Sequence, residues 1–470
     1  MSLFLTFYVD IQGYQEPVLC SNSSLSSILP ENKAPIEIKS VFFMLDIYLK
    51  NPDKYRQLEK DTLEADSLIT RGGGYSYVAA SFKKKSLSLG MKNFNRILHF
   101  DEEKKLIKVE SGITIIELLN FTLKFGLWIP QIPGYPFISI GGAVASNVHG
   151  KSGRQHGTIR NVVKDILIFH KNHGWINLSN DENKKIFDLT IGGFGLTGTI
   201  VSVTLQLSLF EGFNFQTSIK KINSIIEAVN FIKNGKEQNN LLYSWNRVPP
   251  NPENFGDGLI FCNKINSENK EKKLNLIKSF KPRYLKNLFH FCIWNQFSVK
   301  LFNYFFLNYY LKKNTYKDNF NNVMFPYLGK EFYFSSFGNA GLVESQFLID
   351  YEKVESFIND LKKLIISHKP TITLFSAKGM SGEQKYLRFE GNMVCLSIDI
   401  ARNQKNISFL NELDKLYVEY GALPSIIKDS RLKKEVFDRC YKFADEFRKD
   451  LRSFDNKRFY RSELSDRLGL

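Results

Sequence analysis

Two glycine-rich segments in the first half of the chain could hold a dinucleotide through backbone atoms. The first is Arg71-Gly72-Gly73-Gly74-Tyr75-Ser76-Tyr77, which follows a stretch typical of a strand. Glycine has no Cβ atom, so this turn lets backbone N–H groups surround a pyrophosphate closely. The second, residues 133–150, is a run of small residues that ends in His-Gly. Either segment alone is typical of a tight turn, whereas the two together favour a ligand site.

Other segments resemble phosphate-binding or metal-binding motifs but lack the features that such motifs need. Residues 193–198 match GxGxxG, but they lead into a β-branched strand where a dinucleotide fold needs a helix. Residues 150–152 resemble the end of a P-loop, yet Ala145 occupies the required glycine position. The seven histidines lack metal-ligand spacing and the five cysteines form no CxxC. The sequence therefore predicts no metal site, and the cysteines are typical of reduced thiols.

Strands and one well-marked helix position these segments. Strands are expected at residues 68–70, 106–110, 162–169 and 198–207. Thr114 and Glu117 form a capping box that opens a helix with apolar residues at 115, 118, 119 and 123. Gly126 should end that helix.

From about residue 209 the pattern changes to amphipathic helices between strands. Ser224 and Glu227 form a second capping box, which opens a helix through residue 232, and an apolar stripe marks a third helix over 354–365. With the segments around them they predict two strand–helix–strand units. Further helical patterns cover residues 406–420 and 434–452.

Composition and charge restrict the function class. Of the 470 residues 43% are hydrophobic and 24% charged, which excludes a disordered, fibrous or multispanning membrane protein. The net charge of +16 favours an acidic partner: nucleic acid, anionic lipid or a phosphorylated substrate. We expect no nucleic acid, because no recognised module is present. Residues 1–10 lack a basic n-region and a cleavage site, so no signal peptide is expected.

Residues 289–311 form an aromatic stretch with basic residues on both sides. Asn295, Gln296 and Lys300 interrupt it, which makes it a poor transmembrane span. Aromatic content with basic flanks suits a segment that lies in a membrane interface. Packing against its own domain is an equally good interpretation.

These segments together resemble the FAD-binding domain of the vanillyl-alcohol oxidase superfamily, the PCMH type. The matching residues are 71–77, 126–130, 133–134, 141–151, 192–198 and 428–431. Residues 461–470 resemble the family's closing helix. The resemblance spans nearly the whole chain and is strongest in the flavin domain. It implies an α+β fold with a two-subdomain FAD-binding domain at 1–208. An inserted α+β substrate, or cap, domain with a largely antiparallel sheet would follow at 209–422, before the chain returns to the FAD-binding domain at 423–470.

The resemblance implies non-covalent FAD. Many relatives attach the flavin through a His, and Tyr75 occupies that position here. The residues implied to bind the cofactor are Arg71, Gly72, Gly73, Gly74, Tyr75, Ser76, Tyr77, Gly134, Ser139, Ile140, Gly141, Gly142, Ser146, Val148, His149, Gly150 and Ile200.

Catalytic and substrate-binding residues are implied in the same way. Lys428 would be the fixed cation beside the flavin, and His149 would lie next to flavin and sugar. The implied substrate-binding residues are Tyr77, Lys151, Gln346, Lys378 and Cys395. For Lys378 a solvated surface position is the alternative, and for Cys395 a plain buried strand position.

The resemblance implies an FAD-dependent oxidoreductase that oxidises a ring hydroxyl of a polyprenyl-phosphate-linked sugar to a ketone. This would be the first half of an epimerisation in cell-envelope glycan synthesis, completed by a short-chain reductase. The basic charge fits a cytoplasmic enzyme, peripheral on the inner membrane. Met324 and Met393 replace a Tyr and an Asn of the family, so the sugar stays open. The alternatives are an aldonolactone or alditol oxidase acting on a soluble sugar and a flavin-binding subunit without turnover.

Overall fold

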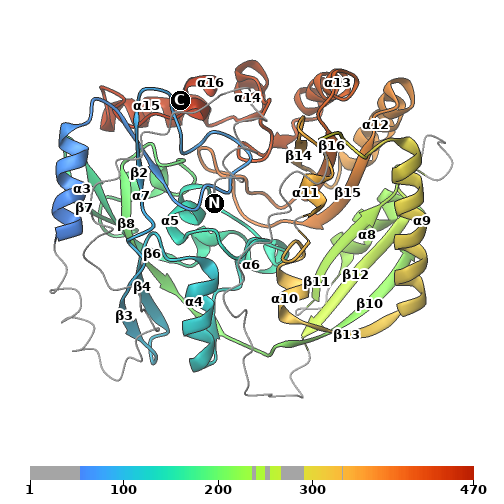
Figure 1. Cartoon of the computed structure of the whole chain (residues 1–470), viewed down its shortest axis with the longest axis horizontal. Helices are drawn as coiled ribbons and strands as arrows, with labels where there is room; N and C mark the ends of the chain where they lie inside the picture. The colour runs from blue at the N-terminus through green and yellow to red at the C-terminus, as the bar shows by residue number, and fades with distance from the viewer. Residues whose placement is uncertain (1–52, 236–239, 249–254, 266–289, 331) are drawn as a thin grey trace.

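The computed structural model describes residues 53–235, 240–248, 255–265, 290–330 and 332–470. An antiparallel sheet lies in each half of the molecule, and helices pack around both (Figure 1). The fold is α+β, as predicted, and the sheet of the second half is largely antiparallel. The predictions for residues 1–10, for the basic flank at 281–286 and for residue 289 lie outside the described residues.

The first half is built on a five-stranded sheet. Its strands in spatial order are β3 (Ile97–Asp101), β4 (Leu106–Glu110), β8 (Thr199–Gln206), β6 (Val163–His170) and β7 (Gly174–Ser179). Two small sheets pair β1 (Leu68–Arg71) with β2 (Leu87–Gly90) and β5 (Leu127–Trp128) with β9 (Ser208–Leu209). The predicted strands are confirmed to within one residue at each end.

Helices of this half flank the glycine-rich segments. They are α3 (Asp53–Glu64), α4 (Ile115–Thr122), α5 (Ile140–Ala145), α6 (Gly153–His156) and α7 (Lys184–Thr190), with 3-10 turns η2 (Leu123–Phe125) and η3 (Ile159–Asn161). The Thr114–Glu117 capping box is confirmed, since each residue accepts a hydrogen bond from the other's backbone N–H. Gly126 ends η2 with φ +67°, a conformation that favours glycine.

The second half is built on an eight-stranded sheet. Its strands in spatial order are β13 (Thr315–Asn319), β10 (Asn214–Ile222), β12 (Gly258–Ile265), β11 (Asn240–Asn246), β15 (Ile372–Gly379), β16 (Val394–Ala401), β14 (Leu342–Ile349) and β17 (Leu423–Pro424). The two predicted strand–helix–strand units are confirmed as β10–α8–β11 and β14–α12–β15.

The two faces of this sheet have different cover. Three helices, α8 (Ile225–Asn234), α12 (Val354–His368) and α13 (Gln404–Tyr420), bury one face in a shared apolar core. The aromatic helix α9 (Gln296–Lys313) packs on part of the other face, near the short helices α10 (Phe320–Met324) and α11 (Phe332–Ser335). That second face also carries the polar residues of the site described below.

One capping detail differs from the prediction. Ser224 Oγ accepts a hydrogen bond from the Glu227 backbone N–H at 3.1 Å, as expected for a capping box. The Glu227 carboxylate, however, accepts from the backbone of Asn223 at 2.8 Å rather than from Ser224. The helix begins where predicted, and the return bond is displaced by one residue.

The C-terminal segment crosses from the second half back to the first. After β17 come α14 (Lys434–Cys440), α15 (Ala444–Phe454) and α16 (Glu463–Leu468). The single helical pattern predicted over 434–452 is wrong, because the chain bends at Tyr441, whose buried hydroxyl donates to Pro424 O at 2.7 Å. Both helices bury apolar residues in the same cluster, which explains the unbroken pattern.

Candidate active site

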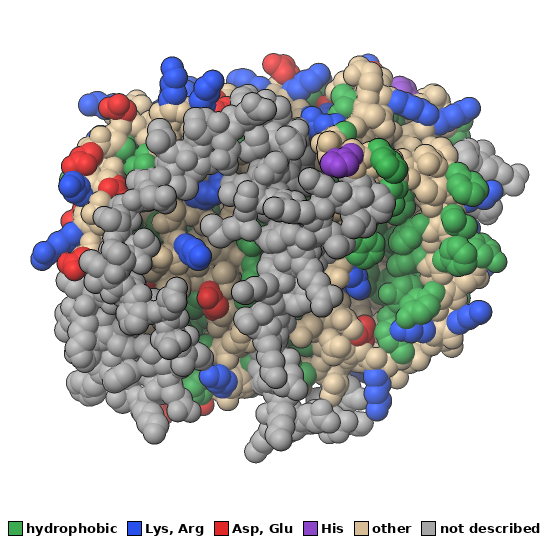
Figure 2. All heavy atoms as spheres, viewed as in Figure 1, with side chains coloured by type: hydrophobic (Ala, Val, Ile, Leu, Met, Phe, Trp, Pro, Cys, Tyr) green, Lys and Arg blue, Asp and Glu red, His purple; other side chains and the backbone are tan. Residues whose placement is uncertain are grey.

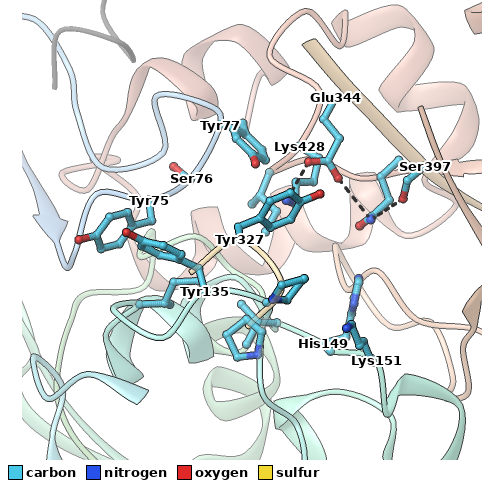
Figure 3. Close-up of a pocket in the computed structure, with 18 of the residues that line it drawn as sticks. Tyr75, Ser76, Tyr77, Tyr135, His149, Lys151, Tyr327, Glu344, Ser397 and Lys428 are labelled. Atoms are coloured by element: carbon cyan, nitrogen blue, oxygen red, sulfur yellow. Dashed lines mark hydrogen bonds and ion pairs between the residues drawn. The ribbon is translucent and has the colours of Figure 1, made fainter. Parts of the chain in front are cut away.

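A cavity of about 1350 Å³ lies between the glycine-rich segments and the polar face of the eight-stranded sheet. Its lining includes the turn at residues 72–77, the stretch at 145–151, residues of β11, β14 and β15, and the inner side of α9. Figure 3 shows Tyr75, Tyr135, Tyr327 and Lys428 converging on it from separate segments. Elements far apart in the sequence therefore supply one site.

The glycine turn leaves no room for side chains. A Cβ atom on Gly72 would lie 2.1 Å from Ser139 Oγ, and one on Gly73 would lie 2.7 Å from the Tyr75 ring. Gly74 has φ +72°, which favours glycine. The backbone of this turn therefore borders the cavity directly, as a site for a dinucleotide requires.

The second glycine segment completes this wall. Ser139 Oγ accepts from the Gly142 backbone N–H at 3.3 Å and caps α5. A Cβ on Gly141 would lie 2.7 Å from the Cβ of Ser111, so these backbones touch. The buried Ser111 hydroxyl also lines the cavity, and within the described residues it has no hydrogen-bond partner. Added Cβ atoms would crowd this cradle, and a buried hydroxyl faces it. Both features fit a site that binds the polar groups of FAD.

Lys428 lines the cavity next to the glycine turn. Its Nζ donates to Glu344 Oε2 at 3.0 Å and stands 4.1 Å from the centroid of the Tyr77 ring (Figure 3). The segment that carries it hydrogen-bonds the glycine turn, because Tyr77 N donates to Ile427 O at 3.2 Å. The ammonium group is thereby held between an aromatic face and a carboxylate.

His149 is a neutral donor in this site. Burial first, and then the charges of Lys378 and Lys428, lower the pKa of His149 well below its usual range. Its Nδ1 lies 3.5 Å from Lys378 Nζ, and an ammonium can only donate. We therefore assign the imidazole hydrogen to Nε2, leaving that atom to donate to a ligand. The ring stacks on Phe389 with centroids 5.5 Å apart.

Lys151 is the second cation next to His149. Its Nζ donates to Val323 O and lies 4.3 Å from the centroid of the Tyr243 ring. Burial, opposed by the charge of Asp318 and assisted by the charges of Lys378 and Lys330, lowers the pKa of Lys151 to about 7. An anionic ligand would favour the protonated form of this lysine.

Most of the implied site residues line the cavity, and three do not. Every glycine implied to bind the cofactor lines it, as do His149, Lys151, Gln346, Lys378 and Lys428. The lining does not include Arg71, Ile140 and Cys395. Ile140 and Cys395 are fully buried, and burial raises the pKa of the Cys395 thiol to about 11. Cys395 thus has the plain strand position considered as its alternative.

Sequence reasoning missed several lining residues. Tyr135, Tyr327, Glu344 and Ser397 all line the cavity (Figure 3). Glu344 could have been found, because it is two residues from Gln346 and so shares its face of a strand. Tyr327 places a tyrosine in the cavity although Met324, where the family has one, lies in the core.

Comparisons with known proteins agree with this geometry. A model described as an FAD binding domain matches residues 61–177. Decaprenylphosphoryl-beta-D-ribose oxidase of Mycolicibacterium smegmatis is 27% identical over 420 residues, covering 86% of this chain and 89% of the relative.

Two further relatives match a quarter of this chain. D-lactate dehydrogenase of Anaerostipes hadrus is 28% identical over 124 residues, and L-gulonolactone oxidase of Mus musculus is 29% identical over 116 residues. Each match covers 25% of this chain and 26% of the relative. Residues 61–177 thus match an FAD-binding domain, and the similarity to FAD-dependent oxidases and dehydrogenases makes this chain an FAD-dependent oxidoreductase that acts on CH–OH groups.

Proposed function

We propose that this flavoenzyme oxidises a ring hydroxyl of a sugar linked through phosphate to a polyprenyl lipid, yielding a keto sugar. The observation that carries the proposal is the composition of this cavity. Its lining combines the glycine turn, polar side chains of β14 and β16, lysines, and aromatic residues of β11, β12 and α9. A flavin, a sugar, a phosphate and a lipid would each find suitable surroundings in this lining.

In the cofactor half, the glycine turn and residues 139–142 would hold non-covalent FAD, which supplies the hydride acceptor. Lys428 would orient the reacting hydroxyl and hold positive charge beside it. His149 would donate from Nε2 to a second ring oxygen. Gln346 Nε2 donates to Ser397 Oγ at 2.8 Å, and this pair would fix the sugar's remaining hydroxyls.

The aromatic rings of Trp245, Phe261, Phe306 and Tyr310 support a lipid-linked substrate rather than a soluble one. Phe306 packs on Trp245 with ring centroids 4.3 Å apart, and Tyr310 packs on Phe261 at 5.0 Å. These rings line the same cavity as Lys428. A free sugar or lactone would leave this apolar wall in contact with water, whereas a polyprenyl chain would cover it.

The outer side of α9 supports a working position on a membrane surface. Phe297 is 75% exposed, and Tyr304 and Phe305 are each 62% exposed. Figure 2 shows hydrophobic side chains gathered on the side of the molecule that carries α9, with lysines and arginines nearby. In the described part of the chain no helix is long and apolar enough to cross a bilayer. Interfacial contact fits aromatic rings flanked by basic residues.

An anaerobic titration tests the proposed reaction. We expect a polyprenyl-phosphate pentose to bleach the visible absorbance of the bound flavin, and a separate short-chain reductase to be needed to reduce the keto product. Acid precipitation should release the yellow colour into the supernatant, since the flavin is not covalent. Bleaching by gulonolactone or an alditol instead would favour an oxidase of soluble sugars. A flavin that no sugar reduces would favour a subunit without turnover.

A further inference from the structure

Two carboxyl groups lie side by side on the sheet that forms the floor of the cavity. Glu344 on β14 and Asp399 on β16 are directly paired in the antiparallel register. The next pair on the same face is Gln346 and Ser397. Glu344 lines the cavity, while Asp399 is 2% exposed and lies beneath it.

Only one of the two carboxyl groups is positioned to carry charge. Asp399 accepts a hydrogen bond from the Tyr333 hydroxyl at 2.9 Å, and within the described residues its other oxygen has no partner. Burial, and then the neighbouring Glu344 carboxylate, raise the pKa of Asp399. The proton therefore stays on Asp399. The negative charge stays on Glu344, where Lys428 Nζ lies 3.0 Å away.

The other lysines of the cavity differ from Lys428 in this respect. Within the described residues no carboxylate oxygen lies within 4.0 Å of Lys151 Nζ or Lys378 Nζ. Lys378 faces His149, and Lys151 donates to a carbonyl and lies over a tyrosine ring. Lys428 thus forms an ion pair with a carboxylate, whereas Lys151 and Lys378 form none within 4.0 Å, although the Asp318 carboxylate acts on Lys151 from a longer distance.

We propose that Glu344 divides these cations by function: it reserves Lys428 for the reacting ring, while Lys151 and Lys378 bind the phosphate of the substrate. This rests on the proposed function, because it takes the substrate to be a phosphate-linked sugar. A singly charged phosphodiester gains most where cations are desolvated and lack a counter-ion. The ring that follows the phosphate then lies over Glu344, Gln346 and Lys428.

The first test is the affinity of the FAD-loaded enzyme for methyl farnesyl phosphate, a phosphodiester without a sugar. Lys378→Ala should weaken binding about 10- to 100-fold, the loss of a charge-assisted hydrogen bond. The double variant Lys428→Met/Glu344→Gln should change it less than about twofold, because this ion pair carries no net charge. Equal losses in the two variants would overturn the proposal.

The second test needs no substrate. Sulfite adds to oxidised flavins and binds more tightly near a cation that is not neutralised. Glu344→Gln should tighten sulfite binding about tenfold, Glu344→Asp should restore most of the normal value, and Lys405→Ala, on the exposed face of α13, should leave it unchanged. An unaltered sulfite affinity in Glu344→Gln would contradict the role given to Glu344. Wild-type enzyme that binds sulfite but not the phosphodiester would contradict the proposed substrate class. The sulfite affinity of Glu344→Gln would still test the role given to Glu344.

Discussion

The two halves of the site recognise their ligands by different means. The cofactor wall is backbone: glycines whose added Cβ atoms would strike Ser139, Ser111 or the Tyr75 ring, and a capped short helix. The substrate wall is side chain: lysines, one ionised carboxylate and aromatic rings from β11, β14, β15, β16 and α9. Backbone recognition depends on shape and tolerates no added atoms, whereas side-chain recognition depends on charge and can be altered one residue at a time. Variants of the two walls should therefore fail in different ways.

The largest effect should come from the point where the two walls meet. Lys428→Met removes the cation but keeps the length of the side chain, so we expect kcat to fall about 10²- to 10³-fold while the flavin stays bound. Stopped-flow reduction of the flavin by the substrate measures this. Lys405→Met, on the exposed face of α13, is the matched control and should react at the normal rate. Loss of flavin from Lys428→Met would place this lysine in the cofactor wall instead.

Added side-chain atoms in the cofactor wall should weaken binding of the cofactor more than binding of the substrate. Gly72→Val places a Cβ 2.1 Å from the cap of α5, and we expect FAD affinity to fall about 10- to 100-fold, as for overpacking of 1–3 kcal/mol. Flavin fluorescence on dilution reports it. Gly90→Val on β2 is the control, because an added Cβ there has no atom within 4 Å. Full retention of flavin in Gly72→Val would show that cofactor binding by this turn does not depend on its shape.

The outer side of α9 extends the comparison to the surface. Replacing Phe297, Tyr304 and Phe305 together with Ser should weaken binding to anionic vesicles about tenfold or more, since three exposed rings leave the interface. Cosedimentation measures the partition. Ile366→Ser is the control: that side chain is also apolar and 39% exposed but lies on α12. Turnover of a short, detergent-soluble substrate should change little, whereas turnover in vesicles should fall.

The smallest effect should be a pH dependence of phosphodiester binding at the substrate wall. The pKa of Lys151 is lowered to about 7, so this lysine is protonated below that pH and neutral above it. Affinity for the phosphodiester should then fall about three- to tenfold between pH 6 and pH 8, and Lys151→Ala should remove that dependence. Isothermal titration at both pH values checks it. A dependence that persists in Lys151→Ala would assign it to another group.

The same contrast explains what could be predicted from the sequence. The glycine turn, the Thr114 cap and the stop at Gly126 are local requirements of the backbone, and each is visible in a few consecutive residues. Glu344 and Asp399 are 55 positions apart, and they meet only through the register of β14 with β16. No local sequence pattern determines how these two strands align, so the acidic pair was not predicted. The bend at Tyr441 was missed for a related reason: it depends on a hydrogen bond to Pro424 across the fold.

The position of α16 has a consequence for how the protein is made. Leu464 N donates to Ala79 O, and Lys83 pairs with Asp466 across 383 residues of sequence. The residues that follow the glycine turn therefore gain these partners only when the last part of the described chain has been synthesised. At ribosomal speed this separates the two segments by roughly 20 to 80 s. The flavin should accordingly load after synthesis rather than during it, and shortage of FAD would act on finished chains awaiting their cofactor.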